Sequence, residues 1–163
     1  MKCLVTGAAG FIGSHLCERL LHAGHTVVGL DALVPYYPAA LKQGNLATAR
    51  THNRFTFHAI DLRSDDPEPL LDGVDAVFHL AAMPGLPQSW TDFDLYESCN
   101  VTGTQRLLEA VRRHSKPQRF IYGSTSSVYG RFASGDETLP ARQIGSTRLN
   151  SSHSRASRMP SSA

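Results

Sequence analysis

The sequence predicts an α/β fold built on a doubly wound parallel sheet with strand order 3-2-1-4-5. Five short β-type runs alternate with stretches of helical periodicity, which is typical of parallel strands joined by right-handed helical crossovers. The fourth run, residues 76–80, is continuously apolar, as expected of a strand that helices cover on both faces. The first run leads into a glycine-rich turn and a helix, which predicts a ligand crevice at the carboxyl end of the sheet.

The glycine-rich turn follows the strand expected at residues 3–5 and reads TGAAGFIG over residues 6–13. Its glycines Gly7, Gly10 and Gly13 have the spacing G-x-x-G-x-x-G. We expect Gly7 to turn the chain sharply off the strand and Gly13 to let the helix pack close to it. Gly10 has no Cβ to hold the backbone away from a pyrophosphate. The turn therefore predicts a dinucleotide site in a Rossmann-type domain.

A helix is expected over residues 11–23. The free amides of its first turn, at Phe11 and Ile12, are expected at the cofactor phosphates, where the positive end of the helix dipole also acts. Ile12, Leu16 and Leu20 recur at helical spacing and predict the stripe that packs on the sheet.

The second strand, residues 27–30, ends in Asp31, 18 residues after Gly13. A carboxylate at this point is placed to accept hydrogen bonds from the adenosine ribose hydroxyls. Asp31 would repel a 2′-phosphate and no Arg or Lys lies near it before Lys42, so the sequence favours NAD over NADP. The alternative is a structural glycine turn with a solvated Asp31, which requires strand, spacing and acid to coincide.

The third strand, residues 55–60, follows a proline-rich loop at 32–38 and a helix expected at 39–50. It ends in Asp61 and Leu62, where a ligand at the carboxyl end of the sheet would meet it. Asp61 either bonds the adenine amino group or caps the next turn, and both interpretations stay open.

The fourth strand runs through Leu80 into Ala81 and Ala82, where small side chains let a cofactor lie against the backbone. His79 in this strand is a candidate catalytic base. A single histidine inside such a strand is more often a core residue with satisfied hydrogen bonds, so the pattern favours a structural His79.

A long helix is expected over residues 92–114. Gly103 lowers its helix propensity, which close packing would explain, and the Asn100 side chain can bond a neighbouring backbone. The fifth strand, residues 119–122, is followed by the Ser- and Thr-rich residues 123–130.

The net charge of +2 belongs to the end of the chain. Residues 142–163 hold four Arg and no acid, whereas residues 1–141 hold 12 Lys and Arg against 14 Asp and Glu. The basic balance is therefore no sign of a nucleic-acid partner. Cys3, Cys17 and Cys99 have no metal-ligand spacing and predict buried thiols in a reducing compartment. We expect a cytoplasmic protein with no metal site, no signal peptide and no membrane anchor.

Several stretches together resemble the extended short-chain dehydrogenase family, in its branch of NAD-dependent epimerases and dehydratases of nucleotide sugars. The resemblance covers residues 1–140. The matching stretches are VTGAAGFIGSHL, GLD at Asp31, DL at Asp61, HLAA at His79, the N-x-x-G-T helix from Asn100 and STSSVYG from Ser124. Residues 35–42 look most like the uronate 4-epimerases that act on UDP-glucuronate. The resemblance implies NAD as cofactor and a UDP-sugar whose C4 hydroxyl is oxidised by hydride transfer before the hydride returns to the other face.

The resemblance also implies roles for residues around the fifth strand. Thr125, four residues before Tyr129, would hold the sugar hydroxyl, because its own hydroxyl can both donate and accept. The alternative is that this Ser/Thr cluster is only a polar strand end. Ser127 stands where related dehydratases carry Glu, which favours simple epimerisation. The nicotinamide half of the cofactor would be bordered by Ala81, Ala82, Tyr122, Gly123 and Ser124.

The main catalyst of the family, a Tyr four residues before a Lys, is absent from this chain. Its lysines are Lys2, Lys42 and Lys116, and none has a Tyr at that spacing. We therefore expect a truncated chain, with a sheet incomplete on its C-terminal side and no turnover. The intact parent is expected to be a homodimer.

Residues 1–141 are expected to form the NAD-binding domain and residues 142–163 a disordered, non-native tail. Two stretches, 146–153 and 157–163, resemble translations of a common sequencing-library adapter, so we interpret residues from about 143 onward as adapter read-through. The competing interpretation is a non-enzymatic NAD-binding module whose basic tail binds a partner. A reductase or dehydratase of the same family is a third.

Overall fold

The computed structural model describes residues 1–114 and 119–124 of the 163-residue chain. The chain divides into two units, Met1–Gly123 and Ser124–Ala163. The fold is that of the first unit, because Ser124 is the one described residue of the second. Thr125 and the tail predicted at residues 142–163 lie outside the described residues.

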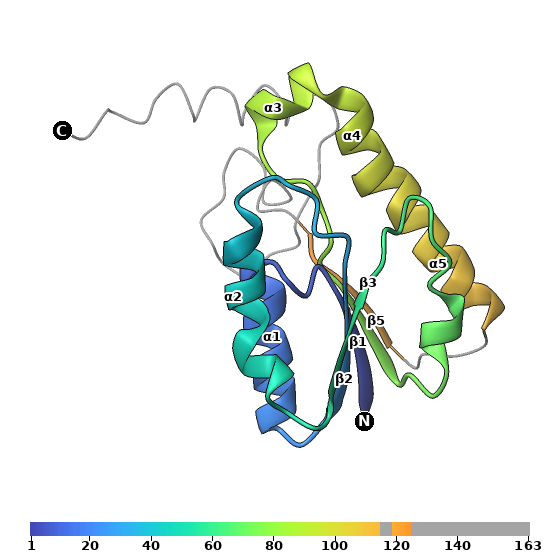
Figure 1. The fold of residues 1–163 in the computed structure, drawn as a ribbon. Coiled ribbons are helices and arrows are strands. Elements are labelled where there is room, and N and C mark those ends of the chain that lie inside the picture. Colours follow the sequence, from blue (N-terminus) through green and yellow to red (C-terminus); the bar gives the residue numbers. More distant parts are fainter. Residues whose placement is uncertain (115–118, 125–163) are drawn as a thin grey trace, which may run out of the picture. The chain divides into compact units, whose positions relative to one another are not determined.

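A five-stranded parallel sheet forms the centre of the first unit, with the strand order β3-β2-β1-β4-β5 (Figure 1). This confirms the predicted order 3-2-1-4-5. The strands are β1 (Lys2–Thr6), β2 (Thr26–Asp31), β3 (Phe55–Ala59), β4 (Ala76–His79) and β5 (Arg119–Tyr122).

Helices lie on both faces of this sheet, with α1 and α2 on one face and the run from α4 to α5 on the other (Figure 1). The sheet is therefore doubly wound, as predicted. The helical segments are α1 (Phe11–His22), α2 (Ala39–Arg50), η1 (Glu68–Leu71), α3 (Leu86–Thr91), α4 (Phe93–Glu97), η2 (Ser98–Thr102) and α5 (Gly103–Arg113).

Each face of the sheet has its own hydrophobic core. Val5 packs in a cluster with Cys17 of α1 and Leu46 of α2, whereas its neighbour Leu4 belongs to a cluster with Leu107 of α5. All five side chains are fully buried. Successive side chains of a strand point to opposite faces, so a sheet covered on both sides needs apolar residues at every position.

The predicted stripe of α1 is wrong at its first position. Ile12 is 69% exposed, and the buried residues of α1 are Gly13, Ser14, Cys17 and Leu21. Gly13 approaches the glycine turn closely, which puts Gly13 and Ser14 on the inner side of the first helical turn and Ile12 on its outer side.

The helix predicted over residues 92–114 consists of three consecutive segments, α4, the π-turn η2 and α5. Gly103 opens α5 and is buried, and a Cβ placed on it would lie 3.4 Å from Cβ of Leu62. Gly103 thus packs against Leu62, but a Cβ there would make contacts of ordinary van der Waals distance, so close packing as the reason for this glycine stays a prediction. The short helix α3 before them was not predicted from the sequence.

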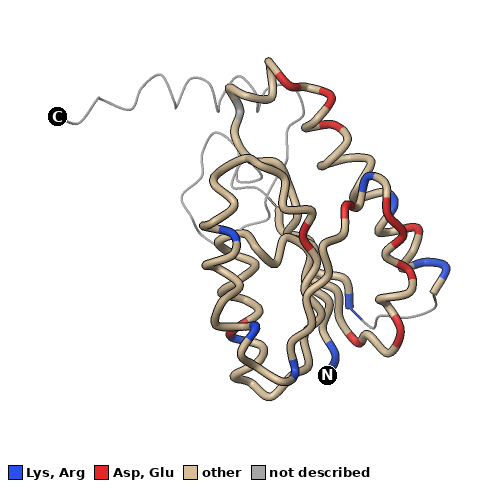
Figure 2. Tube along the Cα trace, viewed as in Figure 1, with Lys and Arg blue, Asp and Glu red and all other residues tan. Residues whose placement is uncertain are grey.

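Charged residues are spread over the first unit. In Figure 2 the Lys and Arg positions of the described residues are scattered over α1, α2 and α5, and acidic positions follow one another along α4. Within residues 1–114 and 119–124, no helix has the length and apolar character needed to cross a bilayer.

Gly13 offers a test of the close approach at the start of α1. A Cβ on Gly13 would collide with the Gly7 carbonyl group, so Gly13→Ala must shift the backbone of the turn. We expect the substitution to lower the free energy of unfolding by about 1–3 kcal/mol, as overpacking of a core does. Urea denaturation followed by circular dichroism measures the change.

Gly44→Ala is the matched control, since nothing lies within 4 Å of a Cβ placed on Gly44 in the middle of α2. This change should raise the free energy of unfolding by roughly 0.5–1 kcal/mol, because alanine favours a helix. Equal effects of the two substitutions would contradict the packing described for α1.

Candidate functional site

The glycine turn between β1 and α1 is shaped by its three glycines. Gly7 has a φ of +69°, and a Cβ on it would lie 2.9 Å from the backbone of Leu80 and Ala81. Gly7 therefore serves both as the turn and as the contact to the end of β4. A Cβ on Gly10 would have only the Gly7 carbonyl oxygen nearby, at 3.1 Å, so that position faces open space among the described residues.

The first turn of α1 carries free donors. Gly10 is the N-cap, no side chain of the described residues caps the helix, and the first turn holds no acid. The first amides of a helix have no partner inside it, and here they include those of Phe11 and Ile12. Both side chains are exposed. Such a terminus is suited to a phosphate.

Asp31 ends β2 and lies against the glycine turn, as the sequence predicts. Its Oδ2 accepts a hydrogen bond from the Ala9 amide at 3.0 Å, and its Oδ1 accepts one from the Leu33 amide at 2.8 Å. The residue is 8% exposed. A carboxylate is thus fixed beside the crossover between β1 and α1, where the ribose of a dinucleotide lies in this fold class.

Lys42 corrects one step of the sequence argument. Its Nζ lies 3.2 Å from Oδ1 of Asp31, so a cation does accompany the acid. The ten residues between them in the chain include the turn into α2, which brings Lys42 back to the end of β2. The helical spacing of residues 42, 46 and 49 could have indicated that Lys42 is buried, because it puts Lys42 on the same face of α2 as the buried Leu46 and Ala49.

Asp61 follows β3 and caps its own turn. Oδ1 accepts hydrogen bonds from the Arg63 amide at 2.9 Å and from its Nε at 3.0 Å, and Oδ2 accepts one from the guanidinium at 2.7 Å. The hydrogen bonds from the Arg63 side chain hold the pKa of Asp61 below its ordinary value. Of the two interpretations of Asp61, the described contacts are those of the cap. The neighbouring Leu62 is buried in the core beside α5.

His79 is a buried core residue with both ring nitrogens paired. Oγ1 of Thr6 accepts hydrogen bonds from the amides of Leu80 and Ala81, each at 3.1 Å, so its proton goes to Nδ1 of His79 at 2.7 Å. Nε2 then carries the ring proton and donates to Oγ1 of Thr104 at 2.8 Å. Burial lowers the pKa of His79 to about 4. The structural role predicted for His79 is confirmed.

The loop after β4 is held by the helical run on the same face. Nδ2 of Asn100 donates to the Met83 carbonyl at 3.1 Å, and its Oδ1 accepts from the Met83 amide at 2.7 Å. This confirms the backbone contact predicted for Asn100. Tyr96 donates to the Pro84 carbonyl at 2.7 Å. Tyr96 lies in α4 and Asn100 in the π-turn η2. The contacts of these two side chains therefore attach the loop after β4 to the helical run.

The end of β5 lies beside the end of β4. The Gly123 amide donates to the His79 carbonyl at 3.0 Å, and a Cβ on Gly123 would lie 2.8 Å from Leu80 Cδ2. Tyr122 is half exposed, with its ring centroid 5.7 Å from that of His79. Leu80, Ala81 and Gly123 are thus brought together, while the contacts predicted for Thr125 lie outside the described residues.

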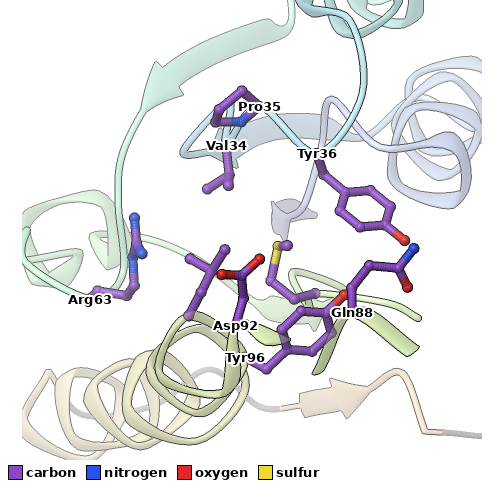
Figure 3. A pocket seen from close by; sticks show the side chains of 9 residues that line it. Val34, Pro35, Tyr36, Arg63, Gln88, Asp92 and Tyr96 are labelled. Carbon is purple, nitrogen blue, oxygen red and sulfur yellow. The ribbon is translucent and has the colours of Figure 1, made fainter. Parts of the chain in front are cut away.

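A cavity of about 590 Å³ opens at the carboxyl edge of the sheet. Figure 3 shows residues from the segments after β2 and β3, among them Tyr36 and Arg63, on one side of it, and Gln88 of α3 and Tyr96 of α4 on the other. Its lining residues are Val34, Pro35, Tyr36, Arg63, Met83, Gln88, Asp92, Leu95 and Tyr96. Ligands of doubly wound sheets bind at this edge. Within the described part of the chain, no cluster of three or more His, Cys, Asp or Glu side chains is arranged to hold a metal ion.

Known proteins are similar to this chain in sequence and fold. The sequence pattern of the "NAD dependent epimerase/dehydratase family" matches residues 3–159. An "Uncharacterized UDP-glucose epimerase YtcB" of Bacillus subtilis is 47% identical over 155 residues, which cover 91% of this chain and 49% of that protein. A "Probable UDP-glucuronate 4-epimerase" of Rhizobium meliloti is 36% identical over 80% of this chain and 39% of its own length.

A solved structure with the same fold is UDP-glucuronic acid 4-epimerase from Bacillus cereus in complex with UDP-glucuronic acid and NAD. The TM-score is 0.77 and the identity 46%, over 94% of this chain and 50% of that one. The chain thus spans about half the length of these relatives. The family match also reaches into residues 142–159, where we predict a tail.

The buried His79 predicts a pH dependence of stability. Its pKa is about 4 in the folded chain against an ordinary value of 6.5, so the unfolded chain binds this proton more readily between the two values. Above pH 6.5 His79 does not reduce the free energy of unfolding. As the pH falls toward 4, the free energy of unfolding decreases by up to about 3 kcal/mol because of this group. Urea titrations between pH 4 and pH 7 measure the slope.

His79→Gln is the control for this slope, since glutamine offers a donor and an acceptor but does not titrate. The variant should lose the part of the slope due to His79, although it is less stable at pH 7. An unchanged slope in the variant would assign the pH dependence to other groups.

Proposed function

The chain belongs to the NAD dependent epimerase/dehydratase family, and from this premise we propose that it carries the NAD-binding half of a nucleotide-sugar epimerase. The observation that carries the proposal is the fixed Asp31 carboxylate beside an uncapped α1. The residues fit NAD, since the turn leaves space at Gly10 and offers amides to a diphosphate. The Bacillus cereus epimerase, described above with bound NAD, supports the same cofactor.

Each part of the site has a stated task in this proposal. The amides of Phe11 and Ile12 bind the diphosphate, and Asp31 accepts hydrogen bonds from the ribose hydroxyls. Ala81, Ala82 and Gly123 leave the nicotinamide half close to the backbone, with the ends of β4 and β5 held together by the Gly123 amide. When bound, NAD supplies a reversible hydride acceptor.

The substrate class proposed is a UDP-sugar, with UDP-glucuronate as the first compound to test. The Bacillus cereus enzyme of 46% identity binds UDP-glucuronic acid, and Ser127 favours epimerisation over dehydration. Thr125 is proposed to hold the sugar hydroxyl during proton transfer. The intact protein is proposed to act as a cytoplasmic homodimer.

Gly10→Ala tests the diphosphate site at a smaller local cost than Gly13→Ala, because the Gly7 carbonyl oxygen needs to shift by only a few tenths of an ångström. A Cβ on Gly10 meets only the Gly7 carbonyl oxygen, at 3.1 Å, but it stands where a diphosphate would rest on bare backbone. We expect NAD to bind at least about tenfold more weakly by calorimetry, a cost of roughly 1.4 kcal/mol. Unchanged affinity in a folded variant would refute the proposed position of the diphosphate, and Gly44→Ala serves again as control.

We further propose that the chain as written does not turn over its substrate, because no Tyr precedes a Lys at the spacing that the family uses. Without an ammonium to lower its pKa, a phenol is a poor base at neutral pH. Chromatography of UDP-glucuronate incubated with NAD and purified chain should reveal no 4-epimer. Conversion would show that another base operates, while leaving the NAD site untouched.

A further inference from the structure

Lys42 is a buried cation at the predicted ribose site. It is 7% exposed, its Nζ lies 3.2 Å from Oδ1 of Asp31, and it stands 5.3 Å from the centre of the Tyr37 ring. Lysine is almost never buried without a partner, because its ammonium loses hydration. The position of Lys42 is therefore set by Asp31 and Tyr37.

The surroundings of this ion pair are part of the glycine turn. The Ala9 amide donates to Asp31, and the Ala9 carbonyl accepts from Nδ2 of Asn45 at 2.9 Å and from the Tyr37 hydroxyl at 3.4 Å. Asn45 of α2, Tyr37 of the loop before it and Asp31 at the end of β2 thus converge on Ala9 of the glycine turn. Lys42 cannot change without a consequence at the ribose site.

We infer that Lys42 is a specificity-determining residue of the dinucleotide site, which neutralises Asp31 and so reduces the discrimination against a 2′-phosphate. The inference rests on the proposed function, since it requires a dinucleotide at the glycine turn. Ammonium groups have three donors and no acceptor, so Lys42 retains donors beyond the one directed at Asp31. These donors suit ribose or phosphate oxygens equally.

Lys42 would reduce the discrimination against a 2′-phosphate because it changes the net charge at the end of β2. A carboxylate without a cation repels the added charge of a 2′-phosphate, and the repulsion is strong where water is largely excluded. The ion pair of Asp31 and Lys42 has no net charge, so this repulsion is mostly cancelled. The site therefore binds NAD through the Asp31 oxygens yet tolerates NADP better than Asp31 alone would allow.

Opposite substitutions of the pair test the inference. The readout is the ratio of the dissociation constants of NADP and NAD, measured by calorimetry on the full chain at one ionic strength. Lys42→Met leaves the acid uncompensated and should raise the ratio roughly tenfold. Asp31→Asn leaves the cation unpaired and should lower the ratio below that of the wild type.

Arg50→Met is the matched control, because Arg50 is an exposed cation of the same helix, with its guanidinium carbon 5.1 Å from the centre of the Phe57 ring. The ratio of the dissociation constants of NADP and NAD for this variant should stay within about twofold of the wild-type ratio. If Lys42→Met fails to fold, Lys42→Arg keeps the charge and should keep the ratio, and Asp31→Asn still shifts it toward NADP.

A different result is expected if the ion pair of Asp31 and Lys42 only holds α2 against the end of β2 and does not affect the choice of dinucleotide. In that case Lys42→Met and Asp31→Asn weaken both dinucleotides alike and leave the ratio unchanged, which overturns the inference while the proposed function stands. A wild-type chain that binds neither dinucleotide refutes the proposed function and this inference with it.

Discussion

The hydrogen bond from the Ala9 amide to the Asp31 carboxylate joins the glycine turn to the end of β2. A buried carboxylate must be satisfied by donors, and here two backbone amides and one ammonium supply them. The same contact fixes the turn that starts α1, since Ala9 lies between Gly7 and Gly10. The phosphate end and the ribose end of the candidate site are thus parts of one hydrogen-bonded unit.

A second buried network holds the other half of the site. Thr6, at the end of β1, connects through His79 to Thr104 of α5, whose hydroxyl donates to the Asn100 carbonyl at 2.8 Å. The Asn100 side chain in turn holds the Met83 backbone. The turn and the loop after β4 are therefore positioned by the same chain of buried and partly buried polar contacts.

Much of this was predictable, because strand order and glycine roles follow from local rules. The continuous apolar runs predicted a sheet covered by helices on both faces. A single histidine inside such a run predicted that His79 has a structural role. The failures concern contacts that depend on how elements meet. Ile12 is exposed because the Gly13 contact rotates the first turn of α1, and α3 begins where Gly85 takes a φ of +98°. Neither effect is visible in periodicity, and the pairing of Lys42 with Asp31 became clear only once α2 was in place.

The central claim is that a dinucleotide diphosphate rests on the backbone between Gly7 and Gly13. Amide chemical-shift changes in ¹⁵N-labelled chain titrated with NAD test this most directly. The account predicts that the largest changes occur at the amides of Gly10 to Gly13 and of Leu33, which shares the Asp31 carboxylate. Changes confined to α5 and β5, or none at millimolar NAD, would contradict it.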